Sequence, residues 1–211
     1  MLRGSQGYAE QADELIARYE SVAFERKHET VLHLLPQTPG SALDIGAGSG
    51  ADAAWLASQG HRVVAVEPTA AFRSRAMALH PSPSIEWVDD GLPRLDRIRA
   101  RRQQFGLIMS TAVWMHLDRD ERELAMPIVE TLLAPNGVLL MTLRHGPVPE
   151  GRVMFEVGAE ETMDLAQACG LRAVVHRLTA STQGVNRDAG IMWSHLAFVR
   201  TSSGRAARVR R

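Results

Sequence analysis

The chain has 211 residues, of which 45% are hydrophobic and 23% are charged, and this composition is typical of a globular domain rather than a disordered segment. Its 24 basic and 24 acidic residues give a formal net charge of zero. Zero charge argues against a nucleic-acid partner, because phosphate binding usually requires a basic surplus. Cys169 is the only cysteine, which excludes an internal disulfide and a cysteine-rich metal site.

The cellular compartment is suggested by what the sequence does not contain. No apolar run reaches the roughly 18 to 20 residues that span a bilayer, and the first ten residues lack the apolar core of a signal peptide. We therefore expect a cytoplasmic protein with no membrane partner. Two arginine clusters, at 94–102 and 205–211, contain no interleaved aromatic residues. We expect a solvated helix face and a disordered basic tail there, not a base-stacking surface.

Residues 8–35 have a helical pattern, in which Ala12, Leu15 and Ile16 recur at the spacing of one helix face. Pro36 ends this segment, and the turn-forming residues after it read as a linker. We therefore expect an N-terminal helical cap over 1–37, a single domain over 38–200 and the tail over 201–211.

Apolar runs and helical stretches alternate after the linker, which is the pattern of a mainly parallel sheet with helices on both faces. A capping box of Asp118 and Glu121 marks a helix start, and Pro127 predicts a kink or a later start. A turn is expected at 135–137, and a polar helix or loop at 92–102. We predict strands at 42–45, 62–66, 85–88, 105–109 and 138–143, and helices at 51–58, 69–79, 118–133 and 159–168.

Two final strands are predicted at 171–178 and 191–199, separated by the polar loop 179–190. No long helical pattern connects them, so they should pair antiparallel as an edge hairpin. The predicted fold is therefore a doubly wound, Rossmann-like α/β domain. It has a mainly parallel seven-stranded sheet, an antiparallel terminal hairpin and an N-terminal helical lid.

The most informative motif is the stretch 43–50, which reads LDIGAGSG and connects a buried strand to a helix. Glycines allow a tight turn and a close approach of a ligand to the main chain. The helix that follows presents unpaired N–H groups at its start. A ligand site at this turn is therefore expected.

Acidic residues follow the next two predicted strands. Glu67 ends the second strand, where a carboxylate can accept hydrogen bonds from a ribose diol, and Asp89 and Asp90 follow the third. The carboxyl ends of parallel strands lie at one edge of the sheet, where ligands bind in open α/β folds. The order of the three signals predicts a nucleotide-type pocket.

These motifs resemble those of class I S-adenosylmethionine-dependent methyltransferases over residues 38–200. Besides the glycine turn, the matching stretches are LASQGHRVVAVEP at 56–68, VDDGLP at 88–93, STAVWMHL at 110–117 and LAPNGVL at 133–139. The terminal hairpin also fits this family. The resemblance implies a methyltransferase that uses S-adenosylmethionine as its cofactor.

The resemblance also implies roles for individual residues. Different parts of the motifs would contact the methionine end, the sulfonium, the ribose and the adenine of the cofactor. Asp89 would bind the adenine amine, with Asp90 as the alternative. A tyrosine of the lid would contact the cofactor carboxylate. The implied set is Asp44, Gly46, Ala47 and Gly48 at the methionine end, Glu67 at the ribose, Pro68, Asp89 and Asp90 at the adenine, Ser110 and Thr111 at the sulfonium, and Tyr19 on the lid.

Two other functions fit parts of the pattern. Gly46, Gly48 and Ala51 satisfy a permissive NAD-type Rossmann fingerprint, with Glu67 as the ribose acid. Against an oxidoreductase, the carboxylate of Asp44 would repel a pyrophosphate but favour a cationic sulfonium, and the terminal hairpin is unusual for that fold. A regulatory module that binds S-adenosylmethionine without catalysis is the other alternative.

Four residues are candidates for the substrate side. His116 and His145 are the candidate catalytic bases, although a base is required only if the nucleophile carries a proton at neutral pH. Trp114 and Arg144 are candidates for substrate binding, through stacking and through an anionic group. Each has a structural alternative: a backbone-bonded histidine for His116, a core aromatic for Trp114 and a solvated loop for Arg144 and His145.

The chemical class of the substrate is suggested by the size of the chain. Beyond the shared domain, only the lid and the loop 179–190 are available to build a pocket, which favours a small molecule over a protein or a nucleic acid. No His, Asp and Cys residues show the spacing of metal ligands, so no metal is expected.

Overall fold

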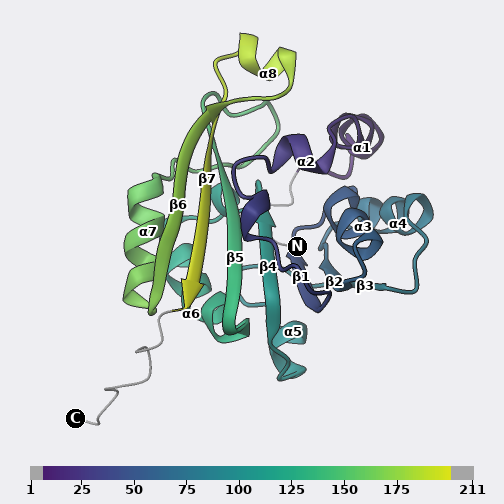
Figure 1. The fold of residues 1–211 in the computed structure, drawn as a ribbon. Helices are drawn as coiled ribbons and strands as arrows, with labels where there is room; N and C mark the ends of the chain where they lie inside the picture. The colour runs from purple at the N-terminus through teal and green to yellow at the C-terminus, as the bar shows by residue number, and fades with distance from the viewer. Residues whose placement is uncertain (1–6, 201–211) are drawn as a thin grey trace.

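A seven-stranded sheet forms the centre of the computed structural model, which describes residues 7–200. The predicted tail at 201–211 lies outside the described residues. The strand order is β3-β2-β1-β4-β5-β7-β6 (Figure 1). The strands are β1 (Ser41–Ile45), β2 (Arg62–Val66), β3 (Ile85–Val88), β4 (Phe105–Thr111), β5 (Leu133–His145), β6 (Leu171–Ala180) and β7 (Met192–Arg200).

Helices connect the strands and cover both faces of the sheet. The helices are α1 (Ala12–Glu20), α2 (Phe24–Lys27), α3 (Ala51–Ser58), α4 (Ala70–Leu79), α5 (Asp96–Ala100), α6 (Arg119–Leu132), α7 (Ala159–Ala168) and α8 (Gly184–Asp188), with 3-10 turns η2 (Leu32–Leu34) and η3 (Trp114–His116).

The strand pairing confirms the predicted fold class. The five strands from β3 to β5 pair in parallel, whereas β7 pairs antiparallel with both β5 and β6. Side chains alternate between the two faces of each strand, so neighbours in sequence enter different cores. Leu43 and Ile45 join the core under α5, α6 and α7, and Ala42 joins the core under α3. The sheet is thus buried on both sides, as its apolar strands predict.

The N-terminal cap differs from the single helical segment predicted for 8–35. α1 ends at Glu20, and Ala23 has an extended backbone with ψ of 142° before α2 begins. The side chain of Phe24 stacks on Trp55 of α3 with ring centroids 3.9 Å apart. The residues of the predicted face, Ala12, Leu15 and Ile16, all lie in α1 and pack in one cluster with Phe72 of α4, so the helix breaks only after this face. α1 packs near α4, whereas α2 packs near α3.

Other boundaries also differ from the prediction. The loop 179–190 contains α8, and β6 extends to Ala180. Only Asp96–Ala100 of the stretch 92–102 is helical. α6 begins at Arg119 with Pro127 inside it, so the later start, one of the two alternatives predicted from Pro127, is wrong, while the Asp118–Glu121 capping box is confirmed.

The predicted turn at 135–137 lies inside β5 as an irregularity of the strand. Phe105 pairs with Leu133 but Leu107 pairs with Val138, so the register with β4 shifts across the turn. Asn136 has a φ of 61° there, a left-handed conformation that asparagine adopts more readily than most residues. The turn therefore exists, but the strand continues on both sides of it.

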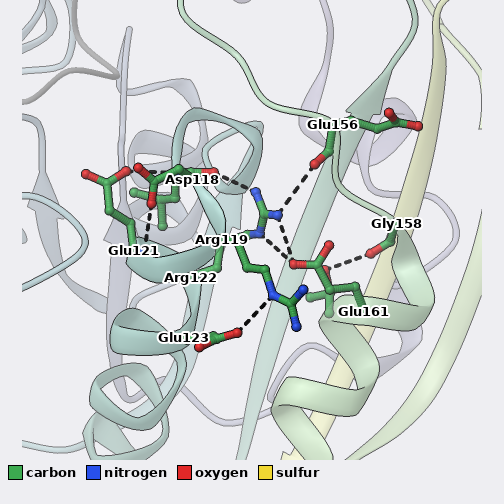
Figure 2. A network of polar contacts seen from close by, with 10 residues as sticks. Asp118, Arg119, Glu121, Arg122, Glu123, Glu156, Gly158 and Glu161 are labelled. Atoms are coloured by element: carbon green, nitrogen blue, oxygen red, sulfur yellow. Dashed lines mark hydrogen bonds and ion pairs between the residues drawn. The ribbon is translucent and has the colours of Figure 1, made fainter.

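Arg122 fixes the segment that leaves β4 (Figure 2). Its guanidinium is buried, and it donates to the Leu117 carbonyl at 2.6 Å and to Glu161 Oε1 at 2.9 Å. Glu161 lies in the first turn of α7. This side chain therefore ties the start of α6 to α7 and holds η3 beneath the carboxyl end of β4.

Residues 7–200 contain neither a membrane-spanning helix nor a cluster of metal ligands. None of the described helices combines the length and apolar character that crossing a membrane requires. Within the same range, no three His, Cys, Asp or Glu side chains are grouped so that they could hold a metal ion.

Replacing the partner of Arg122 should destabilise the fold. In Glu161→Gln the buried guanidinium loses its anionic partner, so we expect the free energy of unfolding to fall by about 2 kcal/mol. Chemical denaturation measures this, with Glu160→Gln as the matched control, since Glu160 is exposed on the same helix turn. Equal stability of the two variants would show that the ion pair contributes nothing.

Candidate active site

A cavity of about 300 Å³ lies at the carboxyl ends of β1, β2, β4 and β5. The strand order reverses at β1, which has β2 on one side and β4 on the other, and ligands of open α/β folds bind at such switch points. One end of the cavity is lined by the glycine turn after β1. The other end is lined by residues of β5, β7 and the N-terminal lid, the segment 7–35 that contains α1 and α2. In Figure 1, α2 lies next to this end of β4 and α1 lies farther out, beyond α2.

The glycine turn contains three left-handed glycines, of which Gly46 and Gly48 line the cavity and Gly50 is the N-cap of α3. Gly46 has a φ of +72° and Gly48 a φ of +56°. A Cβ on Gly46 would lie 2.5 Å from Val113 Cγ2, which is too close for any side chain. Ala47 follows, and its N–H donates to the Val66 carbonyl at 2.9 Å. Gly46, Ala47 and Gly48 all line the cavity, so a ligand can approach the main chain directly.

Asp44 presents a buried carboxylate beside this turn. It is 1% exposed and lines the cavity, and its Oδ2 has no hydrogen-bond partner among the described residues. Burial raises the pKa of Asp44 well above its usual value, and the neighbouring Asp52 adds to the shift. An unpaired buried carboxylate is costly. A cationic ligand group in the cavity would therefore favour its ionised form.

Glu67 lies at the end of β2, where the sequence predicts a ribose acid. It accepts hydrogen bonds from the main-chain N–H groups of Gly48 at 2.9 Å and Thr69 at 2.8 Å. Burial raises the pKa of Glu67, although these two donors oppose the shift. A carboxylate has about four acceptor sites, so Glu67 can hold the turn and still accept from a ligand. Pro68 lines the cavity beside it.

Neither aspartate after β3 lines the cavity. The Asp89 side chain is 50% exposed and forms an ion pair with Arg73 at 3.3 Å. Asp90 accepts from the N–H groups of Arg97 at 2.8 Å and Ile98 at 3.0 Å, so it caps the start of α5. Gly91 and Leu92 line the cavity instead. The structure therefore leaves the main chain of this segment, rather than either carboxylate, beside the cavity.

Asp52 of α3 forms a buried charge network that the sequence analysis did not identify. Its carboxylate is 2.7 Å from Lys27 Nζ and 3.0 Å from His28 Nε2, and Thr111 Oγ1 donates to it at 3.0 Å. Burial alone would raise the pKa of Asp52, but His28 and Lys27 hold it far below its usual value. The network joins α2 of the lid to the ends of α3 and β4.

The two residues expected at the sulfonium end have different surroundings. Thr111 lines the cavity, whereas Ser110 is buried, does not line it and has an Oγ without a hydrogen-bond partner in the described chain. Strand alternation explains the difference, because consecutive residues of β4 point to opposite faces. Tyr19 of α1 also lines the cavity, and its ring lies 3.8 Å from the Cβ position of Gly48.

His116 occupies the cavity wall in one defined tautomer. Its Nδ1 lies 2.8 Å from the Val153 carbonyl, which accepts only, so Nδ1 carries the proton. Its Nε2 therefore carries no proton, and it accepts a hydrogen bond from the Tyr8 hydroxyl at 2.9 Å. Burial lowers the pKa of His116, and burial raises that of Tyr8. A neutral imidazole and a neutral phenol thus face the cavity together.

The remaining candidates divide between cavity and core. Arg144 lines the cavity, at the end of β5. Trp114 is fully buried in the core under α6 and does not line the cavity, so it is a core aromatic rather than a substrate-stacking residue. His145 lies outside the lining and is 2.8 Å from Ser194 Oγ. The structure therefore places His116 and Arg144, but not Trp114 or His145, where a substrate could touch them.

Comparison with known proteins agrees with this geometry. A family described as Methyltransferase domain matches residues 43–141. An uncharacterized methyltransferase of Oceanobacillus iheyensis is 26% identical over 164 residues, which are 77% of this chain and 70% of that protein.

Solved structures share the fold. The 1,6-didemethyltoxoflavin-N1-methyltransferase of Burkholderia thailandensis, solved with 1,6-didemethyltoxoflavin and S-adenosylhomocysteine, has a TM-score of 0.71 at 20% identity, over 92% of this chain and 85% of that one. The N-methyltransferase NodS of Bradyrhizobium japonicum WM9, solved with S-adenosylhomocysteine, has a TM-score of 0.69 at 20% identity, over 91% and 97%.

The fold and the family match over residues 43–141 confirm the resemblance to class I S-adenosylmethionine-dependent methyltransferases seen in the sequence. The matched range, 43–141, contains the glycine turn, Glu67 and the end of β4. It does not include the lid, the loop at 149–154 or the terminal hairpin.

Sequence reasoning missed residues that the fold brings to the cavity from outside the motifs. Tyr8 stands at the start of the segment with the helical pattern and Arg152 lies between predicted elements, so neither belongs to a motif. For Asp52 a signal existed, because it is an isolated carboxylate in the apolar stretch ADAAWLA. Its partners lie in α2, far away in sequence, so the signal alone did not indicate its role.

Removing the Asp52 charge should loosen the lid. Asp52→Asn deprives Lys27 and His28 of their anion, and we expect a loss of about 3 kcal/mol in the free energy of unfolding. Amide hydrogen exchange should accelerate over residues 12–35 and stay unchanged in α7. Asp13→Asn is the control, because its ion pair with Arg75 on the same lid is exposed. Unchanged exchange in Asp52→Asn would contradict the role of the network.

Proposed function

We propose that this protein transfers a methyl group from S-adenosylmethionine to a nucleophilic atom of a small molecule. The observation that carries the proposal is the unpaired, buried carboxylate of Asp44 beside the glycine turn, in a cavity that continues past β4 to β5. One end of this cavity has the charge that a cationic cofactor requires, and the other end has room for an acceptor.

The residues present fit this cofactor. S-adenosylmethionine supplies a methyl group that is already activated by a positively charged sulfur. Asp44 would pair with the cationic end of the cofactor or accept hydrogen bonds from it. The left-handed turn at Gly46 and Gly48 would make room for the methionine part of the cofactor. Glu67 would accept hydrogen bonds from the ribose hydroxyls. Tyr19 would cover the methionine end from α1. Pro68, Leu92 and the main chain of Gly91 would surround the adenine, with no carboxylate required there.

The enclosure of the cavity supports a small acceptor. The lid is joined to a loop by the Gln11–Arg152 hydrogen bond at 3.0 Å, and to the segment before α8 by Gln183 Nε2, which donates to the Arg18 carbonyl at 3.2 Å. A macromolecular substrate would have to displace these contacts to bring its nucleophile to β4. A small molecule fits within them, and positioning is the main requirement of an in-line transfer.

The Tyr8–His116 pair offers a path for a proton. An acceptor N–H or O–H at the Tyr8 hydroxyl would donate its proton there, while the phenol proton moves to His116 Nε2. The Val153 carbonyl then stabilises the resulting imidazolium through Nδ1. His116 would act in this way as the general base, and acceptors that carry no proton would not need it.

Asp44 should control cofactor affinity. In Asp44→Asn the dissociation constant for S-adenosylmethionine should rise by a factor that corresponds to about 1 to 3 kcal/mol. Because the pKa of Asp44 is raised, wild-type affinity should increase as the pH rises through that value, with release of a proton on binding. Calorimetry in buffers of different ionisation enthalpy measures both effects.

The control for this measurement is Asp96→Asn, whose carboxylate is exposed on α5. S-adenosylhomocysteine and NAD are titrated in parallel. Binding of NAD without the other two ligands would contradict the proposed function. Equal affinity of Asp44→Asn and wild type would contradict the role of Asp44.

His116 should stay neutral below the ordinary histidine pKa of about 6.5. Its lowered pKa means that the protonated form appears only at more acidic pH, so Nε2 remains an acceptor throughout the neutral range. Nitrogen-15 NMR should show the Nδ1–H tautomer, and Tyr8→Phe should shift the Nε2 resonance. Thr131→Val, which removes an exposed hydroxyl on α6, is the control and should not. An Nε2–H tautomer, or an imidazolium at pH 7, would contradict the assignment.

A further inference from the structure

We infer that the methyl acceptor carries an oxyanion, a carboxylate or a phosphate group, and that Arg144 and Arg152 bind it. This inference rests on the proposed function and specifies the substrate class of the same cavity. Arg144 and Arg152 are half-buried and line the cavity, and Arg18 lines it from α1 with an exposed side chain. Three guanidinium groups from β5, a loop and the lid therefore border one space.

Their position separates them from the cofactor residues. Arg144 lies at the end of β5, which is two strands away from β1 in the sheet order. Neighbouring strands are separated by about 4.8 Å, so β5 lies about 10 Å across the sheet from β1. The register places Arg144 four residues beyond Leu140, which is level with Asp44. Thr111 of β4 lies between these two strands. The acceptor must approach the methyl group from the side opposite the sulfur, so it occupies the β5 side.

Arg144 and Arg152 are half-buried without an anionic partner, whereas every other arginine of residues 7–200 is either paired with a carboxylate or exposed. Within residues 7–200 no ion pair joins Arg18, Arg144 or Arg152 to a carboxylate. The one hydrogen bond of the Arg144 guanidinium that the structure shows is to the Gly146 carbonyl, at 3.5 Å. The paired arginines are Arg73 with Asp89, Arg75 with Asp13, Arg99 with Asp96, Arg101 with Glu86, Arg119 with Glu123, Arg122 with Glu161 and Arg200 with Glu130.

Arg152 also has an unused donor. Its Nη2 donates to Gln11 at 3.0 Å and its guanidinium lies 3.9 Å from the centre of the Tyr8 ring, but its Nε is buried without a hydrogen-bond partner in the described chain. Buried polar groups of this kind are normally satisfied. An oxyanion in the cavity would supply the missing acceptor.

The carboxylates that line the cavity do not neutralise these arginines. Asp44 and Glu67 lie on the cofactor side, Asp52 pairs with Lys27 and His28, and Glu121 belongs to the capping box of α6. Burial lowers the pKa of Arg144, and its neighbours Arg18 and Arg152 contribute to the shift. Charge repulsion and desolvation both disfavour this cluster when no anion is bound.

The walls around the arginines suit the uncharged body of such an acceptor. Trp193 and His195 of β7 line this end of the cavity. Burial lowers the pKa of His195 to about 4, so it is neutral at physiological pH. It is 8% exposed, and its Nδ1 has no partner among the described residues. An apolar ring and a neutral polar atom thus flank the guanidinium groups, which can bind carboxylate or phosphate oxygens in pairs.

The experiment uses benzoate as an anionic probe and benzamide as its neutral counterpart. Both are titrated by saturation-transfer NMR against protein saturated with S-adenosylhomocysteine, whose own binding is first measured by calorimetry. We expect benzoate to bind at least about tenfold more tightly than benzamide, and at least about tenfold more weakly to Arg144→Gln or Arg152→Gln. Arg172→Gln, on the exposed side of β6, is the control and should bind benzoate as wild type does.

Competition then identifies the kind of oxyanion. Displacement of benzoate at lower concentrations of inorganic phosphate than of acetate indicates a phosphate ester, and the reverse order indicates a carboxylic acid. Both results support the inference, and unchanged S-adenosylhomocysteine affinity in each variant shows that it is folded.

Three results would overturn the inference. The first is no binding of benzoate or phosphate to wild-type protein that does bind S-adenosylhomocysteine. The second is equal benzoate affinity in wild type and both variants. The third is a loss of S-adenosylhomocysteine affinity in both variants with unchanged benzoate binding, because the arginines would then serve the cofactor. Failure of wild type to bind S-adenosylhomocysteine would instead overturn the proposed function, and this inference with it.

Discussion

The reversal of strand order at β1 is the constraint on which the rest of the structure depends. Because β2 pairs on one side of β1 and β4 on the other, the connections leave the sheet in opposite directions and open a space above the strand ends. Asp44, Glu67, Thr111 and Arg144 are distant in sequence but lie in that space, since each is at or near the carboxyl end of a parallel strand. The helices, the lid and the hairpin then determine how the space is closed.

The parts of the site that follow from local chemistry could be predicted from the sequence. The glycine turn needs left-handed residues, so Gly46 and Gly48 mark it directly. Glu67 could be placed because a nearly continuous apolar run before it identifies a strand buried on both faces. The fold class followed from the same alternation, and the final pair of strands could be recognised because no helix separates them. In each case the neighbours that decide the structure are close in sequence.

The rest of the site depends on contacts between distant segments, which a single sequence does not reveal. Asp90 looks like a ligand-binding carboxylate in sequence, but α5 folds back so that its N–H groups bind Oδ2, while the Gly91 N–H donates to Oδ1. Trp114 follows β4 as an exposed aromatic would, yet η3 turns it into the core. The partners of Asp52 come from α2, and the partner of His116 comes from Tyr8. Tertiary structure, rather than residue type, decided these four cases.

The contacts that close the cavity also determine how it opens. Gln11 with Arg152 and Gln183 with the Arg18 carbonyl join three segments at positions exposed to water, where one hydrogen bond contributes on the order of 1 kcal/mol. The buried Asp52 network holds the other end of the lid far more firmly. The lid therefore has an anchored end near α3 and a weakly held end near α8, as a hinged flap does. Hinged closures of this kind move in microseconds to milliseconds. Opening at the weakly held end would let ligands pass while the buried Asp52 network stays intact.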